Sequence, residues 1–342
     1  MNRRDALRVG LAAGISGLAR MPLHAGDDGA RVMTVRGPIA PEEMGPTLPH
    51  EHVLVDFVGA EEVSRDRYDP DEVHRVVLPH LRRIHEQGIR TLVDCTPAYL
   101  GRDPILLRRL AASSGLNILI PTGYYGAGRG KYLPGHARTE SADELAARWL
   151  GEWREGIEGT GIRPGFIKLG ADAGPLSEVH RKLVRAAARV HLACGLTVAA
   201  HSGDGVAALE ALGILRAEGV DGSAFLWVHA NAEADKGLHV RAAEAGAWVE
   251  FDGVGPGGID RHVELVRSMK ESDHLGRVLV SHDAGWYHVG EPGGGEFRPY
   301  DTLMADFLPA LREAGLTEAE VRRLTEDNPH TAFTTRVRPA RS

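Results

Sequence analysis

Eight short apolar segments recur along the chain, and an amphipathic stretch follows most of them. The segments are residues 47–55, 91–96, 117–122, 165–170, 196–201, 225–229, 247–252 and 277–283. In the stretches between them, such as 71–87 and 206–218, apolar residues recur three and four positions apart, which indicates helices. Near-continuous apolar strands joined by crossover helices form parallel sheets. Eight such units close most economically as a (β/α)8 barrel, which is the fold we predict.

A doubly wound open sheet is the alternative architecture, but no Gly-rich fingerprint follows the first apolar segment. A length of 342 residues would allow two average domains, although α/β barrels of about 250 residues or more form a single unit. We therefore predict one barrel domain over residues 26–342. We expect its last helix to be capped by Thr317 with Glu320 and to stop at Asn328-Pro329.

The first 25 residues are typical of an export signal. Arg3 and Arg4 are adjacent, a weakly apolar stretch follows them, and small residues surround Ala25, as in a twin-arginine signal. The apolar stretch is shorter than the roughly 20 residues that span a bilayer, so we expect no stable membrane anchor. The mature protein would then begin near Gly26 and work in the periplasm, or in the cytoplasm if this start of the chain is mis-assigned.

The composition narrows the kinds of partner and of chemistry. Lys and Arg number 40 against 47 Asp and Glu, which gives a net charge of −7 and lacks the basic footprint of a nucleic-acid binder. Small molecules are the partners that we expect. Cys95 and Cys194 are the two cysteines, and we expect both to be free thiols, so Cys-rich zinc modules are excluded. The 17 histidines leave His and carboxylate chemistry open.

Six residues whose side chains could bind a metal ion lie at the carboxyl ends of five of the predicted strands. They are His50, His52, Lys168, His201, His229 and Asp283. The carboxyl ends of barrel strands line the active site, and strand alternation places the two histidines of the first strand on the same inward side. Each residue could instead have a structural role. A histidine could be a hydrogen-bonded core residue, the lysine could form a salt bridge, and the aspartate could cap a turn or helix. If all six residues had only these structural roles, their common position at strand ends would be a coincidence. We therefore predict a metal site.

The strand-end motifs TLPHEH, GFIKLGAD, VAAHSGDG, WVHANAEAD and LVSHDAGW, with the closing segment DNPHTAF, resemble those of the phosphotriesterase family in the amidohydrolase superfamily. The resemblance implies two divalent ions, usually zinc, and a homodimer. It places His50, His52 and Asp283 on the buried ion and His201 and His229 on the more exposed one. Lys168 would bridge both ions as N6-carboxylysine, which also explains an amine within an apolar strand.

Members of this family hydrolyse phosphotriesters, lactones and other esters, and the expected chemistry agrees. A binuclear centre lowers the pKa of bound water from about 15.7 towards about 7 and polarises the substrate oxygen. Asp283 is then the natural proton acceptor. Two alternatives stay open: a catalytically silent barrel that keeps metal or binds a small molecule, and a deaminase of the superfamily, whose members usually carry one metal and no bridging lysine.

Departures from the family pattern bear on the substrate. In the phosphotriesterases proper, a histidine and an acidic residue relay the proton from the aspartate that matches Asp283; Gly253 and Ala232 stand at these two positions. Gly253 also stands where the family's lactonases have an arginine. Tyr125 matches a tyrosine of the family's lactonases. Because a lactone's leaving alkoxide stays nearby and can take the proton directly from Asp283, we expect lactones and carboxylic esters to react better than phosphotriesters.

We assign Tyr125, Asp252, Trp286 and Tyr287 to the substrate pocket. The last two belong to a long Gly-rich and aromatic loop, residues 284–300, that leaves the eighth strand at the active end of the barrel. This loop would form a pocket wall or a lid, with a plain surface excursion as the alternative. Glu51 lies on the opposite side of its strand from His50 and His52, and we expect it to support a neighbouring residue and not to bind metal.

Overall fold

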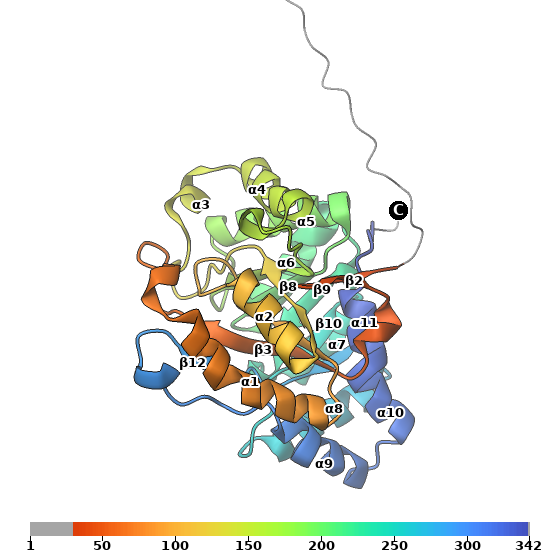
Figure 1. The fold of residues 1–342 in the computed structure, drawn as a ribbon. Helices are drawn as coiled ribbons and strands as arrows, with labels where there is room; N and C mark the ends of the chain where they lie inside the picture. Colours follow the sequence, from red (N-terminus) through yellow and green to blue (C-terminus); the bar gives the residue numbers. More distant parts are fainter. Residues whose placement is uncertain (1–29, 341–342) are drawn as a thin grey trace, which may run out of the picture.

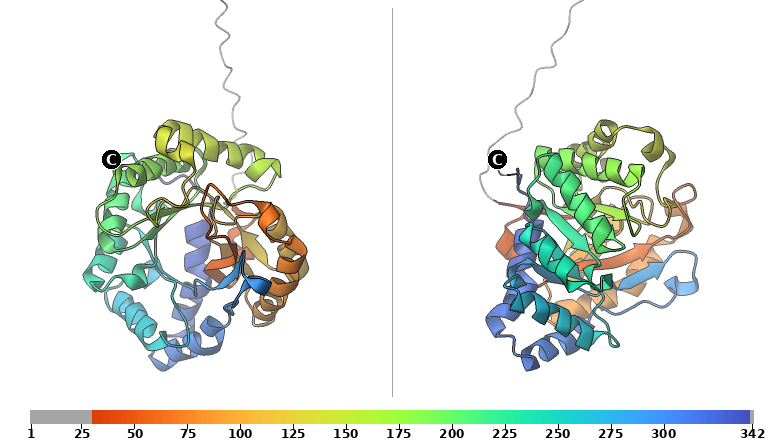
Figure 2. Two further views of the ribbon diagram at one scale, coloured as in Figure 1. Left: turned by 90° about the vertical axis from the view of Figure 1, so that its left-hand side faces the viewer. Right: turned by 180° about the vertical axis from the view of Figure 1, so that it is seen from behind.

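The computed structural model describes residues 30–340 and places a ring of parallel strands inside a layer of helices (Figure 1). The left view of Figure 2 looks into this ring, with the helices around its outside. A short hairpin of β1 (Val32–Thr34) and β2 (Gly37–Ile39) precedes the barrel. The predicted export signal lies outside the described residues.

The barrel contains every strand that the sequence predicts. The strands are β3 (Thr47–Val55), β4 (Thr91–Asp94), β5 (Asn117–Leu119), β6 (Pro121–Thr122), β7 (Phe166–Ala171), β8 (Val198–Ser202), β9 (Phe225–Val228), β10 (Trp248–Phe251), β11 (Val278–Val280) and β12 (Gly285–His288). They pair in parallel in the orders β11-β10-β9-β8-β7-β6 and β12-β3-β4-β5. Since β5 and β6 are two halves of the third strand, and β11 and β12 two halves of the eighth, the predicted (β/α)8 barrel is confirmed.

The eighth strand closes the barrel against β3. The main-chain N–H of Asp283 donates to the carbonyl of His50 at 3.1 Å, and that of His52 donates to the carbonyl of Ala284 at 2.9 Å. Gly285 then begins β12 with φ +94°, and a Cβ at this position would collide with the main-chain oxygen of His52. Only glycine therefore allows the two strands to approach this closely.

Glu51 fixes the same junction from inside, and the residues that it supports belong to the eighth strand. Its buried carboxylate accepts hydrogen bonds from Ser281 Oγ at 2.8 Å, from the main-chain N–H groups of His282 and Ala284 at 3.1 and 2.8 Å, and contacts Nδ1 of His282 at 2.6 Å. A buried carboxylate with this many donors is fully satisfied. It ties the loop that carries Asp283 to the strand that carries the first two histidines.

The helices cover the outside of the ring. They are α1 (Pro70–Glu86), α2 (Pro104–Ser114), α3 (Gly135–Thr139), α4 (Ala142–Glu155), α5 (Glu178–Cys194), α6 (Gly205–Ala217), α7 (Lys236–Glu244), α8 (Ile259–Glu271), α9 (Leu308–Glu313), α10 (Glu318–Arg322) and α11 (Asn328–Phe333). Helix α1 shows how the sequence encodes them: Asp69 caps its first turn, and the residues Val73, Val77, Leu81 and Ile84, three and four positions apart, form its buried face.

The end of the chain differs from the sequence-based expectation. Thr317 does cap α10 through a reciprocal box with Glu320. The helical path does not stop at Asn328-Pro329, however, because a π turn over Arg323–Asp327 leads directly into α11. Pro329 lies in the first turn of α11, where a proline costs little. Asn328 is buried and donates to two carbonyls at the start of the eighth strand, at 2.9 and 2.7 Å.

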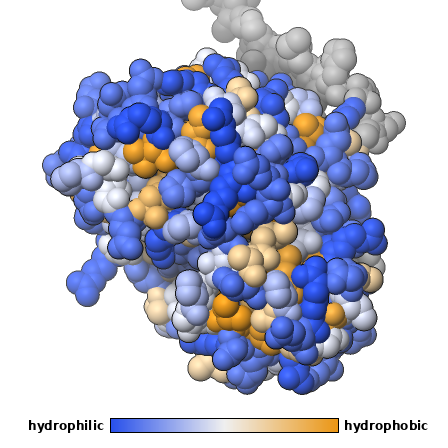
Figure 3. Space-filling model, turned by 60° about the horizontal axis from the view of Figure 1, so that its bottom comes forward, coloured by the Kyte–Doolittle hydropathy of each residue, from blue (hydrophilic) through white to orange (hydrophobic). Residues whose placement is uncertain are grey.

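The surface and the cysteines agree with the composition. The face turned toward the reader in Figure 3 is mainly hydrophilic, with small hydrophobic areas between the charged side chains. Among residues 30–340, no helix combines the length and the hydropathy that a bilayer crossing needs. Cys95 and Cys194 are both free thiols, as predicted.

Candidate metal centre

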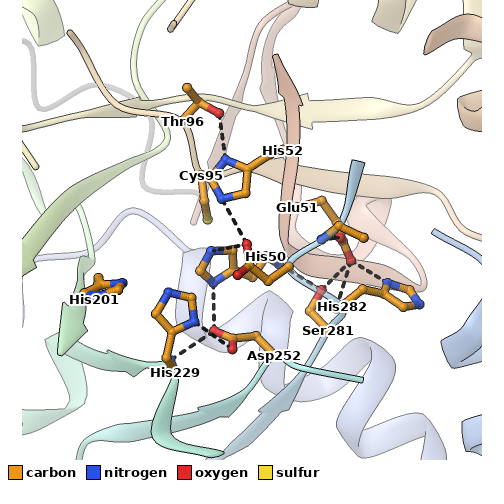
Figure 4. A network of polar contacts seen from close by, with 12 residues as sticks. His50, Glu51, His52, Cys95, Thr96, His201, His229, Asp252, Ser281 and His282 are labelled. Atoms are coloured by element: carbon orange, nitrogen blue, oxygen red, sulfur yellow. Dashed lines mark hydrogen bonds and ion pairs between the residues drawn. The ribbon is translucent and has the colours of Figure 1, made fainter. Parts of the chain in front are cut away.

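One cavity of about 340 Å³ opens at the carboxyl ends of the strands. It is lined by all six residues predicted as metal ligands, namely His50, His52, Lys168, His201, His229 and Asp283. Figure 4 shows the four imidazoles arriving from β3, β8 and the end of β9. The structure thus brings together side chains that are separated by up to 233 positions in the sequence, from His50 to Asp283.

His50, His52 and Asp283 form a compact group of donor atoms. Oδ1 of Asp283 lies 3.2 Å from Nε2 of His52 and 3.8 Å from Nε2 of His50. This oxygen is buried and accepts no well-aligned hydrogen bond. The three ligand atoms lie within 4.8 Å of one another, which is the spacing that a single ion needs. A carboxylate oxygen and two imidazole nitrogens that converge in this way fit a divalent cation.

Lys168 points into the same group from β7. Its side chain is 2% exposed, and Nζ lies 3.4 Å from Nε2 of His50. His201 and His229 line the same cavity, and their ring centroids lie 4.5 Å apart. The ring centroid of His229 lies 5.0 Å from that of His50. A buried amine whose neighbours are imidazoles is costly as an ammonium ion. Lys168 therefore lies among the candidate ligands that line the cavity.

Two acidic side chains hold the far nitrogens of the imidazoles. Asp252 spans two of them, with Oδ1 2.8 Å from Nδ1 of His229 and Oδ2 3.0 Å from Nδ1 of His50 (Figure 4). Glu250 also reaches Nδ1 of His50, with Oε2 at 2.9 Å. Carboxylates in this position orient a metal-binding imidazole and select the tautomer whose other nitrogen faces the metal.

The other two imidazoles are held by hydroxyl groups. Oγ1 of Thr96 lies 2.8 Å from Nδ1 of His52, and Oη of Tyr125 lies 3.0 Å from Nδ1 of His201. The Tyr125 ring packs directly on the main chain of β7, where a Cβ at Gly170 would lie 2.6 Å from it. The glycine of the GFIKLGAD segment therefore makes room for the tyrosine that reaches His201.

The electrostatics favour neutral imidazoles at His50 and His201 and a charged carboxylate at Asp252. Burial lowers the pKa of His50 to about 3 and that of His201 well below its usual value, so both keep a free lone pair. Burial alone would raise the pKa of Asp252, but His229 and His50 outweigh it and hold this pKa well below its usual range. Burial and the neighbouring Asp252 raise the pKa of Glu250 well above its usual range, since two carboxylates would otherwise share one N–H.

Two of the four residues assigned to the substrate pocket require correction. Tyr125 and Trp286 do line the cavity, whereas Asp252 is 1% exposed and lies beneath the imidazoles that it orients. Tyr287 faces away from the cavity, toward a separate surface hollow between Asp69 and Glu291. Adjacent residues of a strand point to opposite sides, so Trp286 and Tyr287 cannot both face the cavity from β12.

Glu250 and Thr96 are functional neighbours that the sequence reasoning missed. Glu250 carried a usable signal, because it is a charged residue within the buried strand Trp248–Phe251, where an unpaired charge would be costly. It also lies two positions before Asp252 and therefore on the same face of the strand. Thr96 carried no comparable signal, since a threonine that follows a strand is common.

Ala232 and Gly253, the two positions of the family's relay, carry no acidic or basic side chain. Ala232 ends a short helical turn, Ala230–Ala232, and its methyl group has no acid or base function. At Gly253 a Cβ would lie 2.7 Å from Nδ2 of Asn231, which occupies the space that a side chain would need. Neither position can carry a proton away from Asp283.

We expect Asp252→Asn to weaken zinc binding by about 10- to 100-fold, because an amide offers one acceptor to the two imidazoles that the carboxylate now orients. The affinity would be measured by competition with a chelator. Asp172→Asn is the matched control: this carboxylate also lines the cavity, but it accepts main-chain hydrogen bonds from Gly128 and Arg129. Equal zinc affinities for the two variants would contradict the orienting role of Asp252.

Comparison with known proteins extends these observations. The model of the phosphotriesterase family matches residues 30–333. The phosphotriesterase homology protein of Escherichia coli is 28% identical over 294 residues, covering 84% of this chain and 98% of the relative. The aryldialkylphosphatase of Saccharolobus solfataricus is 26% identical over 310 residues, covering 86% and 96%.

Solved structures give the same picture. The organophosphorus hydrolase from Deinococcus radiodurans superposes with a TM-score of 0.80 at 29% identity, covering 89% of this chain and 97% of that one. A mutant of a PTE-like lactonase from the same organism gives a TM-score of 0.79 at 29% identity, covering 88% and 99%.

Proposed function

The chain belongs to the phosphotriesterase family, and we propose that it is a metal-dependent hydrolase that prefers lactones and carboxylic esters. The observation that carries this proposal is the convergence of an Asp283 oxygen with two imidazole nitrogens, 3.2 and 3.8 Å away, at a cavity of about 340 Å³. Hydrolysis of esters needs such a polar centre and a space for the substrate above it.

The residues present fit a pair of divalent ions, and we propose zinc. The first ion would be held by His50, His52 and Asp283, the second by His201 and His229, and both by Lys168. When bound, the ions would lower the pKa of a water molecule and polarise the carbonyl oxygen of the ester. The neutral state of the buried imidazoles of His50 and His201 leaves their lone pairs free for this task.

Lys168 can serve as a ligand only in a modified form. As an ammonium ion it offers donors alone and would repel a metal ion. Reaction of the neutral amine with carbon dioxide forms a C–N bond and releases one proton, and the resulting N6-carboxylysine is an anion with two acceptor oxygens. Its place beside Nε2 of His50, at 3.4 Å, supports this assignment.

Asp283 would accept the proton of the attacking water and return it to the leaving group. Its carboxylate lies at the carboxyl end of β11, where the side chain is 25% exposed and can contact the substrate. In lactone hydrolysis the leaving alkoxide stays attached to the acyl group, within reach of this proton. Gly253 and Ala232 provide no onward relay, so substrates that reclaim the proton themselves are favoured.

A panel of three substrates tests the proposed function. We expect zinc-loaded protein to show a higher kcat/KM for a five-membered lactone and for phenyl acetate than for an aryl dialkyl phosphate. Protein loaded with cobalt should keep the same order, because the order depends on the path of the proton. A clear preference for the phosphate triester would contradict the assignment of the substrate class.

A further inference from the structure

A second cavity, of about 390 Å³, lies behind the wall of the metal-centre cavity. Asp56 and Tyr124 line it, whereas Val55 and Tyr125, the residues next to them in the chain, line the metal-centre cavity. The same two segments therefore separate the two spaces. Among the described residues, none of the six candidate metal ligands lines the second cavity. The proposed hydrolysis gives this space no role.

The guanidinium of Arg102 lies at the second cavity, and its side chain is 2% exposed. Glu152 accepts one N–H from each terminal nitrogen, with Oε2 2.9 Å from Nη1 and Oε1 2.6 Å from Nη2. The carbonyl of Pro121 accepts the other N–H of Nη1 at 2.9 Å. Within residues 30–340, the buried Nε has no hydrogen-bond partner. Nη2 also lies 3.5 Å from Oε1 of Glu158, which is too long for a good hydrogen bond.

Two of the five N–H groups of Arg102 are thus without a good acceptor, one on Nε and one on Nη2. These two N–H bonds lie along one edge of the planar guanidinium and point the same way, so the two oxygens of one carboxylate can accept both. A buried donor that lacks an acceptor is unfavourable, and it is more so on a charged group. This edge of the guanidinium is therefore suited to an oxyanion.

Glu158 already brings a carboxylate to this place. Its Oε1 is 3.5 Å from Nη2 of Arg102, and its Oε2 is 2.5 Å from Nη2 of Arg65. The side chain is 45% exposed and belongs to the short turn Ile157–Gly159, so it can move outward without loss of core packing. Glu158 thus occupies the place of an anion between two arginines without filling the fork of Arg102.

The charges around the cavity match a ligand with one negative charge. The carboxylates of Asp56 and Glu152 are each paired with an arginine, at 2.7 and 2.6 Å. Arg65 is paired with Glu158, so an outward movement of Glu158 leaves one positive charge at the cavity without its partner. A monoanion restores the balance.

Tyrosine rings form the rest of the wall. The hydroxyl of Tyr68 donates to Oδ2 of Asp103 at 2.7 Å, and Oη of Tyr124 lies 3.0 Å from Nε2 of His136. Because both hydroxyls are engaged with protein groups, the two rings offer mainly apolar surface to a ligand. The part of the ligand that lies beyond its charged group is therefore expected to be uncharged.

We propose that the second cavity binds a small monocarboxylate. The carboxylate oxygens accept the N–H groups of Nε and Nη2 of Arg102, and the uncharged body lies against the rings of Tyr68 and Tyr124. The ligand and the side chain of Glu158 take turns between the two arginines. This site does not depend on the proposed hydrolysis, because it shares no residue with the candidate metal centre.

Benzoate and benzamide form a matched pair of probes, because they share their size and flatness and differ in charge. We expect benzoate to bind about tenfold more tightly than benzamide in isothermal titration calorimetry, since a charged acceptor strengthens both hydrogen bonds. Glu158→Gln should tighten benzoate binding about two- to fivefold, because an amide competes less well for the arginines. Arg65→Gln should weaken it about two- to fivefold, and Arg102→Lys, which removes the fork and keeps the charge, about tenfold or more.

Arg109→Gln is the matched control for Arg65→Gln. Arg109 is also 44% exposed and paired with a carboxylate, that of Asp71, but it lies outside the cavity. Each titration would be made on zinc-loaded protein and again on chelator-stripped protein, in which benzoate cannot bind zinc. Opposite shifts for Glu158→Gln and Arg65→Gln in both preparations, with no shift for Arg109→Gln, would support the site.

Three outcomes would overturn the site or its ligand class. Benzoate that binds zinc-loaded protein alone, with the same affinity in every variant, is held at the metal centre and not in the second cavity. Stripped protein that does not bind benzoate has no such site. Inorganic phosphate that binds stripped protein more tightly than benzoate would contradict the preference for a monocarboxylate.

Discussion

Replacement of Lys168 by alanine is expected to remove bound zinc and to reduce ester hydrolysis to the background rate. The side chain is 2% exposed and lies 3.4 Å from Nε2 of His50, among the candidate ligands of both ions. The loss of zinc affinity should exceed the about 10- to 100-fold that removal of an orienting group costs. Zinc per chain, measured by atomic emission, checks the first expectation, and lactone turnover checks the second.

Bicarbonate provides an independent test of the same residue. Zinc should return to stripped wild-type protein faster when bicarbonate is added, because carboxylation of Lys168 must precede complete binding. Lys236→Ala, which removes an amine on α7 paired with Glu264, should behave as the wild type in both assays. A wild-type protein that holds one zinc ion and is indifferent to bicarbonate would contradict the bridging role.

Asp283→Asn is expected to lower kcat for a lactone by about 10²- to 10⁴-fold. The amide keeps the shape of the side chain and one oxygen for a metal, but it cannot accept the proton of the attacking water. Its pKa supports the role: although burial would raise this pKa, the contact with His52 holds it below the usual range, so the group is an available base. The experiment requires zinc content near that of the wild type, reached at high zinc concentration.

Asp172→Asn is a suitable comparison, because that carboxylate lines the same cavity and binds the main chain of a loop. It should retain most of the lactone turnover. If Asp283→Asn with full zinc hydrolyses lactones as fast as Asp172→Asn does, another group must accept the proton.

The barrel and the gathering of the six candidate ligands on one cavity were predictable, because both depend on local pattern. Apolar runs bounded by turn residues predicted all eight strands, and parallel strands place their carboxyl ends on one side of the barrel. The candidate ligands are separated from other histidines by this position alone. His180, His191 and His239, for example, lie on helices and contact main-chain carbonyls at 2.8 to 3.0 Å.

The details that sequence reasoning missed depend on tertiary geometry. Tyr287 was assigned to the pocket, but the eighth strand contains left-handed residues: Asp283, between β11 and β12, has φ +53°, and Trp286, within β12, has φ +75°. These conformations set which side of β12 faces inward, and no periodicity in the sequence reports them. Asp252 was misassigned for a similar reason: its carboxylate turns back beneath His50 and His229.

The misjudged end of the last helix has a local cause. A proline usually ends a helix because it lacks an N–H and crowds the preceding turn. Here the π turn Arg323–Asp327 widens the helix just before Pro329, and Asn328 is held by two buried carbonyls of the neighbouring segment. A long-range contact therefore decides the path of the chain at this point.

A zinc titration of chelator-stripped protein, followed by the rate of hydrolysis of a five-membered lactone, tests metal-dependent hydrolysis most directly. We expect no activity without metal and a rise that ends at two zinc ions per chain. Activity that survives removal of all metal, or stripped protein that stays inactive after two zinc ions have bound, would contradict this expectation.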